Sequence, residues 1–330
     1  MSKTTFDSVS AAELARRSRA VAPAVAEHLT VTPLRRFAAL SDELGADLLV
    51  KCEHLQRTGS FKPRGALAKL LTLTAGERER GVVTASTGNH GLGVANALAA
   101  LGGSGHVFVP DTAEPTKVAA LERFGVRVHP RAAEAGAVEL MAREYADERG
   151  LAYVSPYNDA DVIAGQGTIG VELLEQAGTG LDALVVAVGG GGLVSGIAAV
   201  LKEELPGVRI IGASPENDPA MAVSVEKGRI VSVEGRPTLS DGTAGNVEPG
   251  SITLDLCRSL VDEWVLVPEP DIGAALRAVV DTEHELVEGS AAVAFAAARA
   301  CAPRFAGGRV GVISCGRNIS SAALVRALSA

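Results

Sequence analysis

The chain has 330 residues, of which 47% are hydrophobic, 21% charged and only 3% aromatic, and its formal net charge is −8. This length exceeds one small core and suits a large α/β unit or two domains of roughly 150 residues each. The acidic charge argues against nucleic acid or an anionic membrane as the main partner, because both need clustered Lys and Arg; a small-molecule ligand is expected instead.

The cysteines and the first residues indicate the compartment. The four cysteines, Cys52, Cys257, Cys301 and Cys315, have no CxxC spacing and no paired histidines, so neither a zinc site nor a disulfide framework is indicated. Residues 1–7 (MSKTTFD) lack the basic-then-apolar order of a secretory signal. We therefore predict a cytoplasmic protein with reduced thiols.

Short apolar runs alternate with longer helical patterns along the chain, which is typical of βαβ units and a parallel sheet. Predicted strands at residues 81–84 and 106–110 are each followed by a predicted helix, over residues 92–101 and 116–124. The same order returns later, with strands at 184–188, 209–212 and 309–313 and a helix over 195–204. The sequence therefore predicts an α/β fold with parallel sheets.

One predicted strand and helix lie in an uncharged stretch, residues 183–201, whose 19 residues match the length of a membrane-spanning helix. The stretch contains five glycines, four of them consecutive. Each glycine inside a helix costs up to ~1 kcal/mol relative to alanine. A buried strand, a glycine turn and the start of a helix explain the stretch better than a membrane span.

Lys62 lies between Phe61 and Pro63, at the start of a helical pattern over residues 65–70. A solvent-exposed side chain is the default for any single lysine. Burial would lower the pKa of the amine and free its lone pair for imine chemistry. The neighbouring residues alone leave both interpretations open.

The segment from Ser86 to Gly91 (STGNHG) joins a predicted strand to a predicted helix. Its N–H groups and hydroxyls could bind a carboxylate, and the Asn89 amide could bond a ring oxygen or nitrogen. An ordinary helix cap uses the same residue types, so the segment by itself does not decide between a ligand site and a cap.

The run from Gly189 to Gly192, followed by Leu193, lets the backbone approach an oxyanion at the positive end of a helix. Neither the dinucleotide pattern GxGxxG nor the nucleoside-triphosphate pattern GxxxxGK[ST] fits its register. A phosphate monoester is therefore the favoured ligand. The alternatives are a nicotinamide dehydrogenase, with Glu216 after the next strand, and a non-catalytic binding protein on the same fold.

Five motifs in order, SFKPRGA, STGNHG, AGQGT, GGGGL and the C-G-x-N of residues 315–318, resemble fold-type-II pyridoxal-phosphate enzymes of the tryptophan synthase beta-like superfamily. The resemblance is to the serine/threonine dehydratase and serine racemase branch. It implies two intertwined, open, twisted parallel-sheet domains with helices on both faces. Residues 1–55 and 150–330 would form a large cofactor-binding domain, and residues 56–149 a small mobile domain that carries the substrate-carboxylate loop.

The resemblance also implies roles for individual residues, with pyridoxal 5′-phosphate as the cofactor. Lys62 would carry it as a Schiff base, Phe61 would pack on its ring, and Asn89 would bond its ring hydroxyl. The phosphate would bind Gly189, Gly190, Gly191, Gly192 and Leu193; the ring nitrogen would face Cys315 and lie close to Glu288; and the substrate carboxylate would bind Ser86, Thr87, Gly88, Asn89 and His90. Thr87 is also a second candidate catalytic residue.

A thiol is a weak donor that cannot keep the ring nitrogen protonated, so Cys315 disfavours a long-lived carbanion and favours β-elimination. We expect an ammonia-lyase that takes water from L-threonine, L-serine or a related β-hydroxy amino acid, with Lys62 as general base and a 2-oxo acid and ammonia as products. A serine racemase is the alternative. Thr87 argues against it, because racemases carry a serine there. The family's habit predicts a homodimer.

Some positions depart from the family pattern. No metal is predicted, because Ser214, Asp218 and Ala220 stand where metal-binding members supply acidic ligands. Arg317 replaces a glycine and could lie near the cofactor or point to solvent. The chain ends soon after Asn318, so no appended regulatory domain is expected. Residues 154–159 and 240–245 are expected to line the pocket for the substrate side chain.

Overall fold

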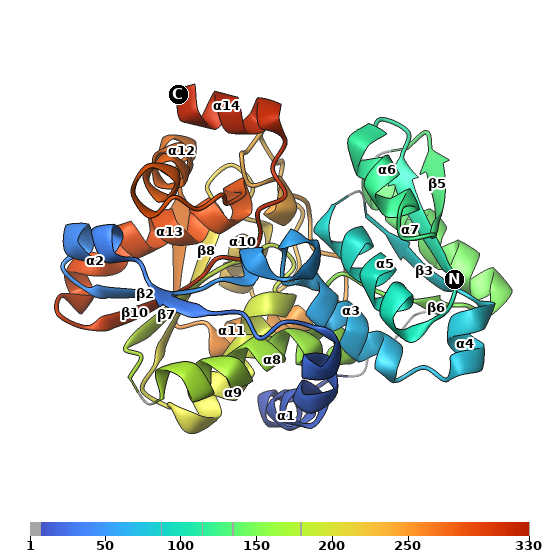
Figure 1. Cartoon of the computed structure of the whole chain (residues 1–330), viewed down its shortest axis with the longest axis horizontal. Helices are drawn as coiled ribbons and strands as arrows, with labels where there is room; N and C mark the ends of the chain where they lie inside the picture. The colour runs from blue at the N-terminus through green and yellow to red at the C-terminus, as the bar shows by residue number, and fades with distance from the viewer. Residues whose placement is uncertain (1–7, 87, 114, 134, 179, 330) are drawn as a thin grey trace.

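The structure is a computed structural model that describes residues 8–329 except 87, 114, 134 and 179. Two α/β lobes lie side by side, each built around its own sheet (Figure 1). Every strand pairing is parallel except the one between β1 and β2. The predicted fold class, two open parallel sheets covered by helices, is confirmed.

The larger sheet has six strands in the order β1-β2-β10-β7-β8-β9. Its strands are β1 (Leu34–Arg36), β2 (Asp47–Lys51), β7 (Ala183–Ala187), β8 (Arg209–Pro215), β9 (Glu263–Val267) and β10 (Arg309–Ile313). Helices cover both of its faces (Figure 1), so the central strand β7 is buried along its whole length and consists only of Ala, Leu and Val.

The helices on the larger sheet fall into two layers (Figure 1). One layer contains α1 (Ala11–His28), α8 (Ala160–Ala177), α9 (Gly192–Glu204) and α11 (Thr253–Leu260), with α10 (Ala220–Lys227) packed on α11. The other layer contains α2 (Ala38–Leu44), α12 (Glu269–Ala278), α13 (Gly289–Cys301) and α14 (Ser321–Ser329). Short helical turns are η1 (Glu53–Leu55), η2 (Arg57–Gly59), η3 (Asp241–Thr243), η4 (Val279–Glu283) and η5 (Ala302–Phe305).

The smaller sheet has four strands in the order β5-β4-β3-β6. They are β3 (Val82–Ala85), β4 (Gly105–Pro110), β5 (Arg127–Arg131) and β6 (Ala152–Tyr153). Its helices are α3 (Lys62–Leu71), α4 (Ala75–Arg80), α5 (Asn89–Leu101), α6 (Pro115–Glu122) and α7 (Ala135–Arg149). The smaller sheet thus extends to residue 153; the division of the chain at residues 55 and 149 stays a prediction.

The predicted elements are present, with shifted ends. The helix predicted over residues 92–101 begins at Asn89, because Gly88 serves as its N-cap and the polar residues of the loop form its first turn. The uncharged stretch is strand β7, a glycine turn and helix α9, as predicted. Among the described residues, none of the helices is both long and apolar enough to cross a membrane.

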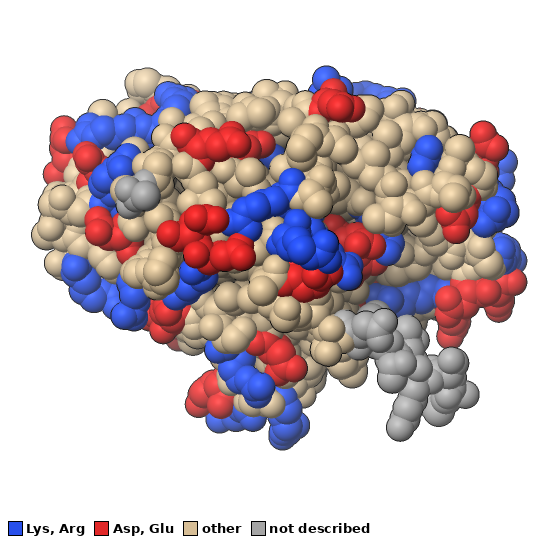
Figure 2. All heavy atoms as spheres, turned by 90° about the horizontal axis from the view of Figure 1, so that it is seen from below, with Lys and Arg blue, Asp and Glu red and all other residues tan. Residues whose placement is uncertain are grey.

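Helix α3 lies between the lobes, where it packs against α5 on one side and α8 on the other. Its contact with α8 depends on Gly165, because a Cβ atom there would lie 2.5 Å from the Arg64 carbonyl oxygen. This close approach explains a glycine of the AGQGT motif and places Lys62, the first residue of α3, between the two sheets. On the face drawn in Figure 2, acidic and basic side chains are interspersed.

Candidate active site

A cavity of about 620 Å³ opens between the two lobes. Its volume is typical of a site for a small molecule or cofactor. All predicted site residues that the structure describes line it: Phe61, Lys62, Ser86, Gly88, Asn89, His90, Gly189, Gly190, Gly191, Gly192, Leu193, Glu288 and Cys315. Thr87 lies outside the described residues, so its predicted roles stay predictions.

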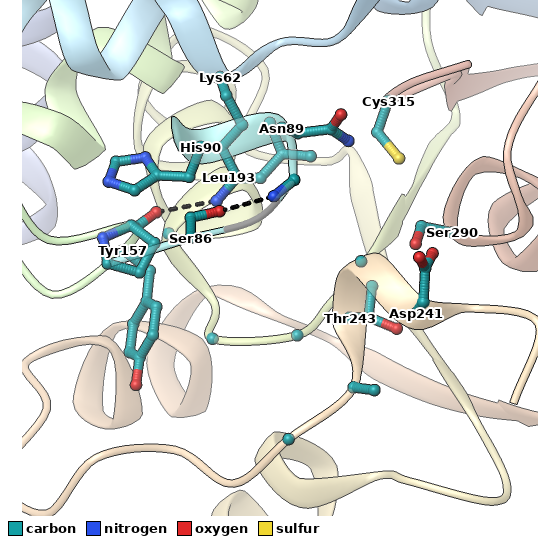
Figure 3. A pocket seen from close by; sticks show the side chains of 18 of the residues that line it. Lys62, Ser86, Asn89, His90, Tyr157, Leu193, Asp241, Thr243, Ser290 and Cys315 are labelled. Carbon is teal, nitrogen blue, oxygen red and sulfur yellow. Dashed lines mark hydrogen bonds between the residues drawn. The ribbon is translucent and has the colours of Figure 1, made fainter. Parts of the chain in front are cut away.

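Lys62 points into the centre of the cavity, with His90 and Tyr157 to one side and Asn89 and Cys315 to the other (Figure 3). The turn that presents it is held by the Phe61 N–H, which donates to the Cys315 carbonyl oxygen at 3.1 Å. The Lys62 amine donates to the Pro156 carbonyl oxygen at 3.0 Å. It lies 5.1 Å from the centre of the Phe61 ring.

Burial lowers the pKa of Lys62 to about 8, although Cys315 and Glu288 oppose the shift. A carbonyl oxygen is the amine's hydrogen-bond partner, and no carboxylate pairs with it among the described residues. A buried amine with such a pKa is a nucleophile and a base near neutral pH. Lys62 is half-buried and lines the cavity, so it is not the solvent-exposed side chain that is the default for a lysine.

The glycine run forms a tight turn between β7 and α9. Gly191 is in the left-handed region with φ of 86°, and a Cβ on Gly190 would lie 2.4 Å from the Tyr157 ring. Side chains are thus excluded on steric grounds, and the backbone itself forms this wall of the cavity. Because the first N–H groups of a helix lack intrahelical partners, the start of α9 can bind an oxyanion here.

The start of α5 forms a second such site on the smaller lobe. The Ser86 hydroxyl accepts a hydrogen bond from the Gly88 N–H at 3.1 Å, and the Ser86 N–H donates to Phe108 at 3.1 Å, so the loop is held at the end of β3 (Figure 3). His90 Nε2 lies 3.0 Å from the Val154 carbonyl oxygen and therefore carries the hydrogen. Burial, and next the Lys62 charge, lower the pKa of His90 to about 3, which keeps this ring neutral.

Cys315 and Glu288 both lie on the larger lobe. Cys315 follows the end of β10, and Glu288 is the N-cap residue of α13. Burial and the neighbouring Glu288 raise the pKa of the Cys315 thiol, so it stays protonated. Burial also raises the pKa of Glu288 to about 7, opposed by hydrogen bonds from Asn89 and from the Asn318 backbone. The Asn89 amide nitrogen donates to both Glu288 oxygens, at 2.9 and 3.1 Å.

The cavity also contains residues to which the sequence assigned no individual role. The Tyr157 ring packs on the glycine turn, and its hydroxyl accepts a hydrogen bond from the Glu248 N–H at 2.9 Å. Both segments expected to line a substrate pocket contribute: Pro156 and Tyr157 from one, Asp241 to Gly245 from the other. The C-G-x-N motif contained a signal for Asn318, whereas nothing in the sequence distinguished Tyr157 or Ser290.

Ion pairs join the two lobes around the cavity. Arg143 of α7 pairs with Glu248 of the larger lobe at 2.7 Å, and Lys117 of α6 lies 3.8 Å from Asp241. The first pair also fixes the loop whose backbone holds the Tyr157 hydroxyl. Arg143 of the smaller lobe is thus linked through Glu248 and Tyr157 to the glycine turn of the larger lobe.

Arg317 is exposed, and its side chain lies beside Gly59. Of its two predicted placements, the structure shows the one away from the cavity lining. At the positions where metal-binding members supply acidic ligands, the Ser214 hydroxyl donates to the Val188 carbonyl oxygen and Asp218 accepts from the Gly245 N–H. Among the described residues there is no group of three or more His, Cys, Asp or Glu that could hold a metal; the absence of a metal stays a prediction.

The residues present fit pyridoxal phosphate. The glycine turn lines the cavity with bare backbone, and the start of α9 suits a phosphate. A buried amine points into the same cavity, and a protonated thiol lies across from it (Figure 3). Phosphate, aldehyde and ring nitrogen thus each have a suitable partner.

Comparisons with known proteins agree with this geometry. A family model described as "Pyridoxal-phosphate dependent enzyme" matches residues 25–316. The chain is 40% identical over 266 residues to an L-threonine ammonia-lyase of Thermotoga maritima, covering 81% of this chain but 66% of that protein. It is 38% identical to a catabolic L-threonine dehydratase of Escherichia coli, covering 81% of this chain and 80% of that one.

Solved structures are similar over nearly the whole chain. Threonine deaminase isoform 2 from Solanum lycopersicum superposes with a TM-score of 0.90 at 31% identity, covering 100% of this chain and 98% of that chain. Maize serine racemase superposes with a TM-score of 0.88 at 29% identity, covering 95% and 96%.

Proposed function

Because the chain belongs to the pyridoxal-phosphate dependent enzymes, we propose that it is an ammonia-lyase that removes water from L-threonine or L-serine. The products are a 2-oxo acid and ammonia. The observation that carries the proposal is Lys62, a half-buried amine with a pKa of about 8 that points into a cavity with an oxyanion site and a protonated thiol. Relatives named as threonine ammonia-lyases or dehydratases support the same reaction.

When bound, pyridoxal phosphate supplies an electron sink that makes the Cα proton of an amino acid acidic. On this chain Gly189 to Gly192 and Leu193 would hold the phosphate, and Phe61 and Asn89 would contact the ring. Cys315 would serve the ring nitrogen, with Glu288 nearby. Because the thiol stays protonated and donates weakly, it does not supply a full proton to that nitrogen.

Lys62 is the general base of this proposal. Its pKa of about 8 leaves a sizeable neutral fraction at neutral pH, so the amine can take the Cα proton. The Ser86 hydroxyl and the N–H groups at the start of α5 bind the substrate carboxylate and orient the Cα–H bond toward Lys62. His90 stays neutral, so the carboxylate site has no charge from this ring. Thr87 belongs to the same carboxylate loop.

The test is direct. Purified enzyme with bound cofactor is incubated with L-threonine and L-serine, and the 2-oxo acid and ammonia are measured separately. Borohydride reduction followed by peptide mapping should place a phosphopyridoxyl group on Lys62. Cofactor on Lys62 without 2-oxo acid or ammonia from any β-hydroxy amino acid would refute the lyase while leaving the family assignment intact.

Serine racemization is the second candidate, favoured by the similarity to maize serine racemase. It predicts D-serine from L-serine, which chiral chromatography of the same reactions detects. The lyase proposal expects 2-oxo acid to form in excess of D-serine, whereas a racemase would give the opposite ratio.

The expected setting of the enzyme is a homodimer in the cytoplasm. The four cysteines are buried and unpaired, which suits a reducing compartment. Light scattering after size-exclusion chromatography measures the oligomeric state, and a monomeric mass would contradict this part of the proposal.

A further inference from the structure

Asn318 joins three parts of the chain that surround Lys62. Its side-chain nitrogen donates to the Asn89 side-chain oxygen at 2.6 Å and to the Thr58 carbonyl oxygen at 2.7 Å. Its backbone N–H donates to Glu288 at 2.9 Å. Asn89 belongs to the smaller lobe and Glu288 to the larger, so Asn318 lies in a hydrogen-bonded chain that crosses the cavity between lobes.

The partners at both ends of this chain determine how the two amides are oriented. The Thr58 carbonyl can only accept, so the nitrogen of Asn318 must face it, and the second hydrogen on that nitrogen is left for Asn89. At the other end, the Glu288 oxygens accept from the Asn89 nitrogen. The oxygen of Asn89 is thereby directed to Asn318 and its nitrogen to Glu288.

The turn before Lys62 is shaped to receive Asn318. Thr58 is in the left-handed region with φ of 64°, which is strained for a non-glycine residue, and Gly59 follows with φ of 74°. A Cβ on Gly59 would lie 2.7 Å from the Asn318 side-chain oxygen. Strained backbone that persists beside a functional lysine and accepts a bond from Asn318 indicates a specific role for that contact.

We propose that Asn318 is a positioning residue that fixes the orientation of the Asn89 amide, so that Asn89 offers N–H donors and not its oxygen to the ring hydroxyl of the cofactor. This rests on the proposed function, because it takes Asn89 as the partner of that hydroxyl. Without Asn318, the Asn89 oxygen loses its donor and Glu288 alone holds the amide in this orientation. An amide that turns over brings its oxygen toward an oxygen of the cofactor.

The test compares Asn318→Asp with the neighbouring Arg317→Ala. Aspartate keeps the shape of asparagine but cannot donate to Asn89 or Thr58. We expect about a tenfold rise in the cofactor dissociation constant from the loss of these two hydrogen bonds, with a shifted absorption band of the bound cofactor. Arg317→Ala keeps the backbone bond to Gly59 and removes only an exposed side chain, so both quantities should stay within about twofold.

A double-mutant cycle separates positioning from a general structural role. If Asn318 acts through Asn89, the pair Asn89→Ala and Asn318→Ala should weaken cofactor binding no more than Asn89→Ala alone. Additive losses would overturn the proposal, because Asn318 would then act independently of Asn89. An unchanged dissociation constant and spectrum in Asn318→Asp and Asn318→Ala would overturn it as well.

Failure of this inference is distinguishable from failure of the proposed function. If the unaltered enzyme carries no cofactor on Lys62 after borohydride reduction, the proposed function fails first. If it does, and the Asn318 variants bind the cofactor as the unaltered enzyme does, only the role of Asn318 is refuted. Thermal unfolding of the cofactor-free variants checks that they fold.

Discussion

In the first turn of helix α3, the two cations Lys62 and Arg64 lie two residues apart in opposite environments. Arg64 is 1% exposed and makes bidentate bonds to Glu53, at 2.7 and 2.9 Å, and to Glu172, at 2.6 and 2.9 Å. It also donates to the Thr168 hydroxyl at 3.1 Å. Lys62, by contrast, has a carbonyl oxygen as its partner.

The two environments move the pKa values in opposite directions. Burial lowers the pKa of Lys62 to about 8. Burial acts on Arg64 as well, but the neighbouring carboxylates of Glu53 and Glu172 outweigh it and raise the pKa of the guanidinium. A buried charge with complete pairing therefore stays charged, whereas one without a counter-ion is ready to lose its proton.

The paired cluster has a structural role. Lys51, at the end of β2, donates to Glu172 at 2.5 Å and to the Thr32 carbonyl oxygen at 2.7 Å. Together with Arg64 it connects β2, α8 and α3, so this cluster of ion pairs holds the helix that carries Lys62. We expect changes in Arg64 to affect stability, and changes in Lys62 to affect chemistry.

The largest expected effect is that of Lys62→Met on activity. Loss of the amine removes both the attachment point and the general base, so turnover should fall by roughly a thousandfold or more. The cofactor-free variant should be more stable, with a free energy of unfolding about 1 to 3 kcal/mol higher than that of the unaltered chain, because a poorly solvated charge is gone. Activity and urea unfolding of the same preparation check both parts.

A Lys62→Met protein that is less stable than the unaltered chain would contradict this contrast. It would mean that the bond from Lys62 to Pro156 contributes more to folding than burial of the charge costs. Lys69→Met, also on α3 but paired with Asp159 at 2.7 Å, is the control, and its activity should change little.

Arg64→Met should have the next largest effect, and on stability. It leaves Glu53 and Glu172 buried without their main partner, which costs about 3 to 5 kcal/mol of unfolding free energy. Urea unfolding measures the loss. Arg16→Met, in an exposed pair with Glu13, should cost less than about 1 kcal/mol. Equal losses in the two variants would show that pairing inside the cluster is not what stabilises it.

The sequence predicted the parts of the site that local constraints determine. The glycine turn was readable because four consecutive glycines fit neither a strand nor a helix interior, and the carboxylate loop because it joins a strand to a helix. The role of Lys62 was not readable in this way, because its environment is made by distant residues such as Pro156, 94 residues away. Only the order of five motifs assigned it a role.

Other features depend on contacts between distant segments and were missed for that reason. Arg64 meets Glu172 across 108 positions, and Tyr157 packs on glycines that follow it by more than thirty residues. The start of α5 at Asn89 was missed because its first turn carries no apolar periodicity. The motif ending in Asn318 was recognised, but its link to Asn89 required the three-dimensional structure.

A smaller expected effect is the pH dependence of stability, which should differ between Glu288 in the cavity and the paired carboxylates around Arg64. Burial raises the pKa of Glu288 from 4.5 to about 7, and among its neighbours Asp241 adds to the shift while Lys117 opposes it. Between pH 4.5 and about pH 7, the folded chain therefore keeps the Glu288 proton that the unfolded chain loses. The stability that Glu288 contributes is fully present below about pH 4.5 and is lost as pH rises through 7.

Glu288→Gln mimics the protonated acid at every pH and should remove this dependence. In urea unfolding of cofactor-free protein, the variant and the unaltered chain should match at pH 4.5, and at pH 8 the variant should be more stable by about 3 kcal/mol. Glu53→Gln should instead make the chain less stable at pH 8, because Arg64 and Lys51 lower the pKa of Glu53 despite its burial. If both variants lost stability at pH 8, Glu288 would be a paired charge like Glu53, and the contrast between the two regions would not hold.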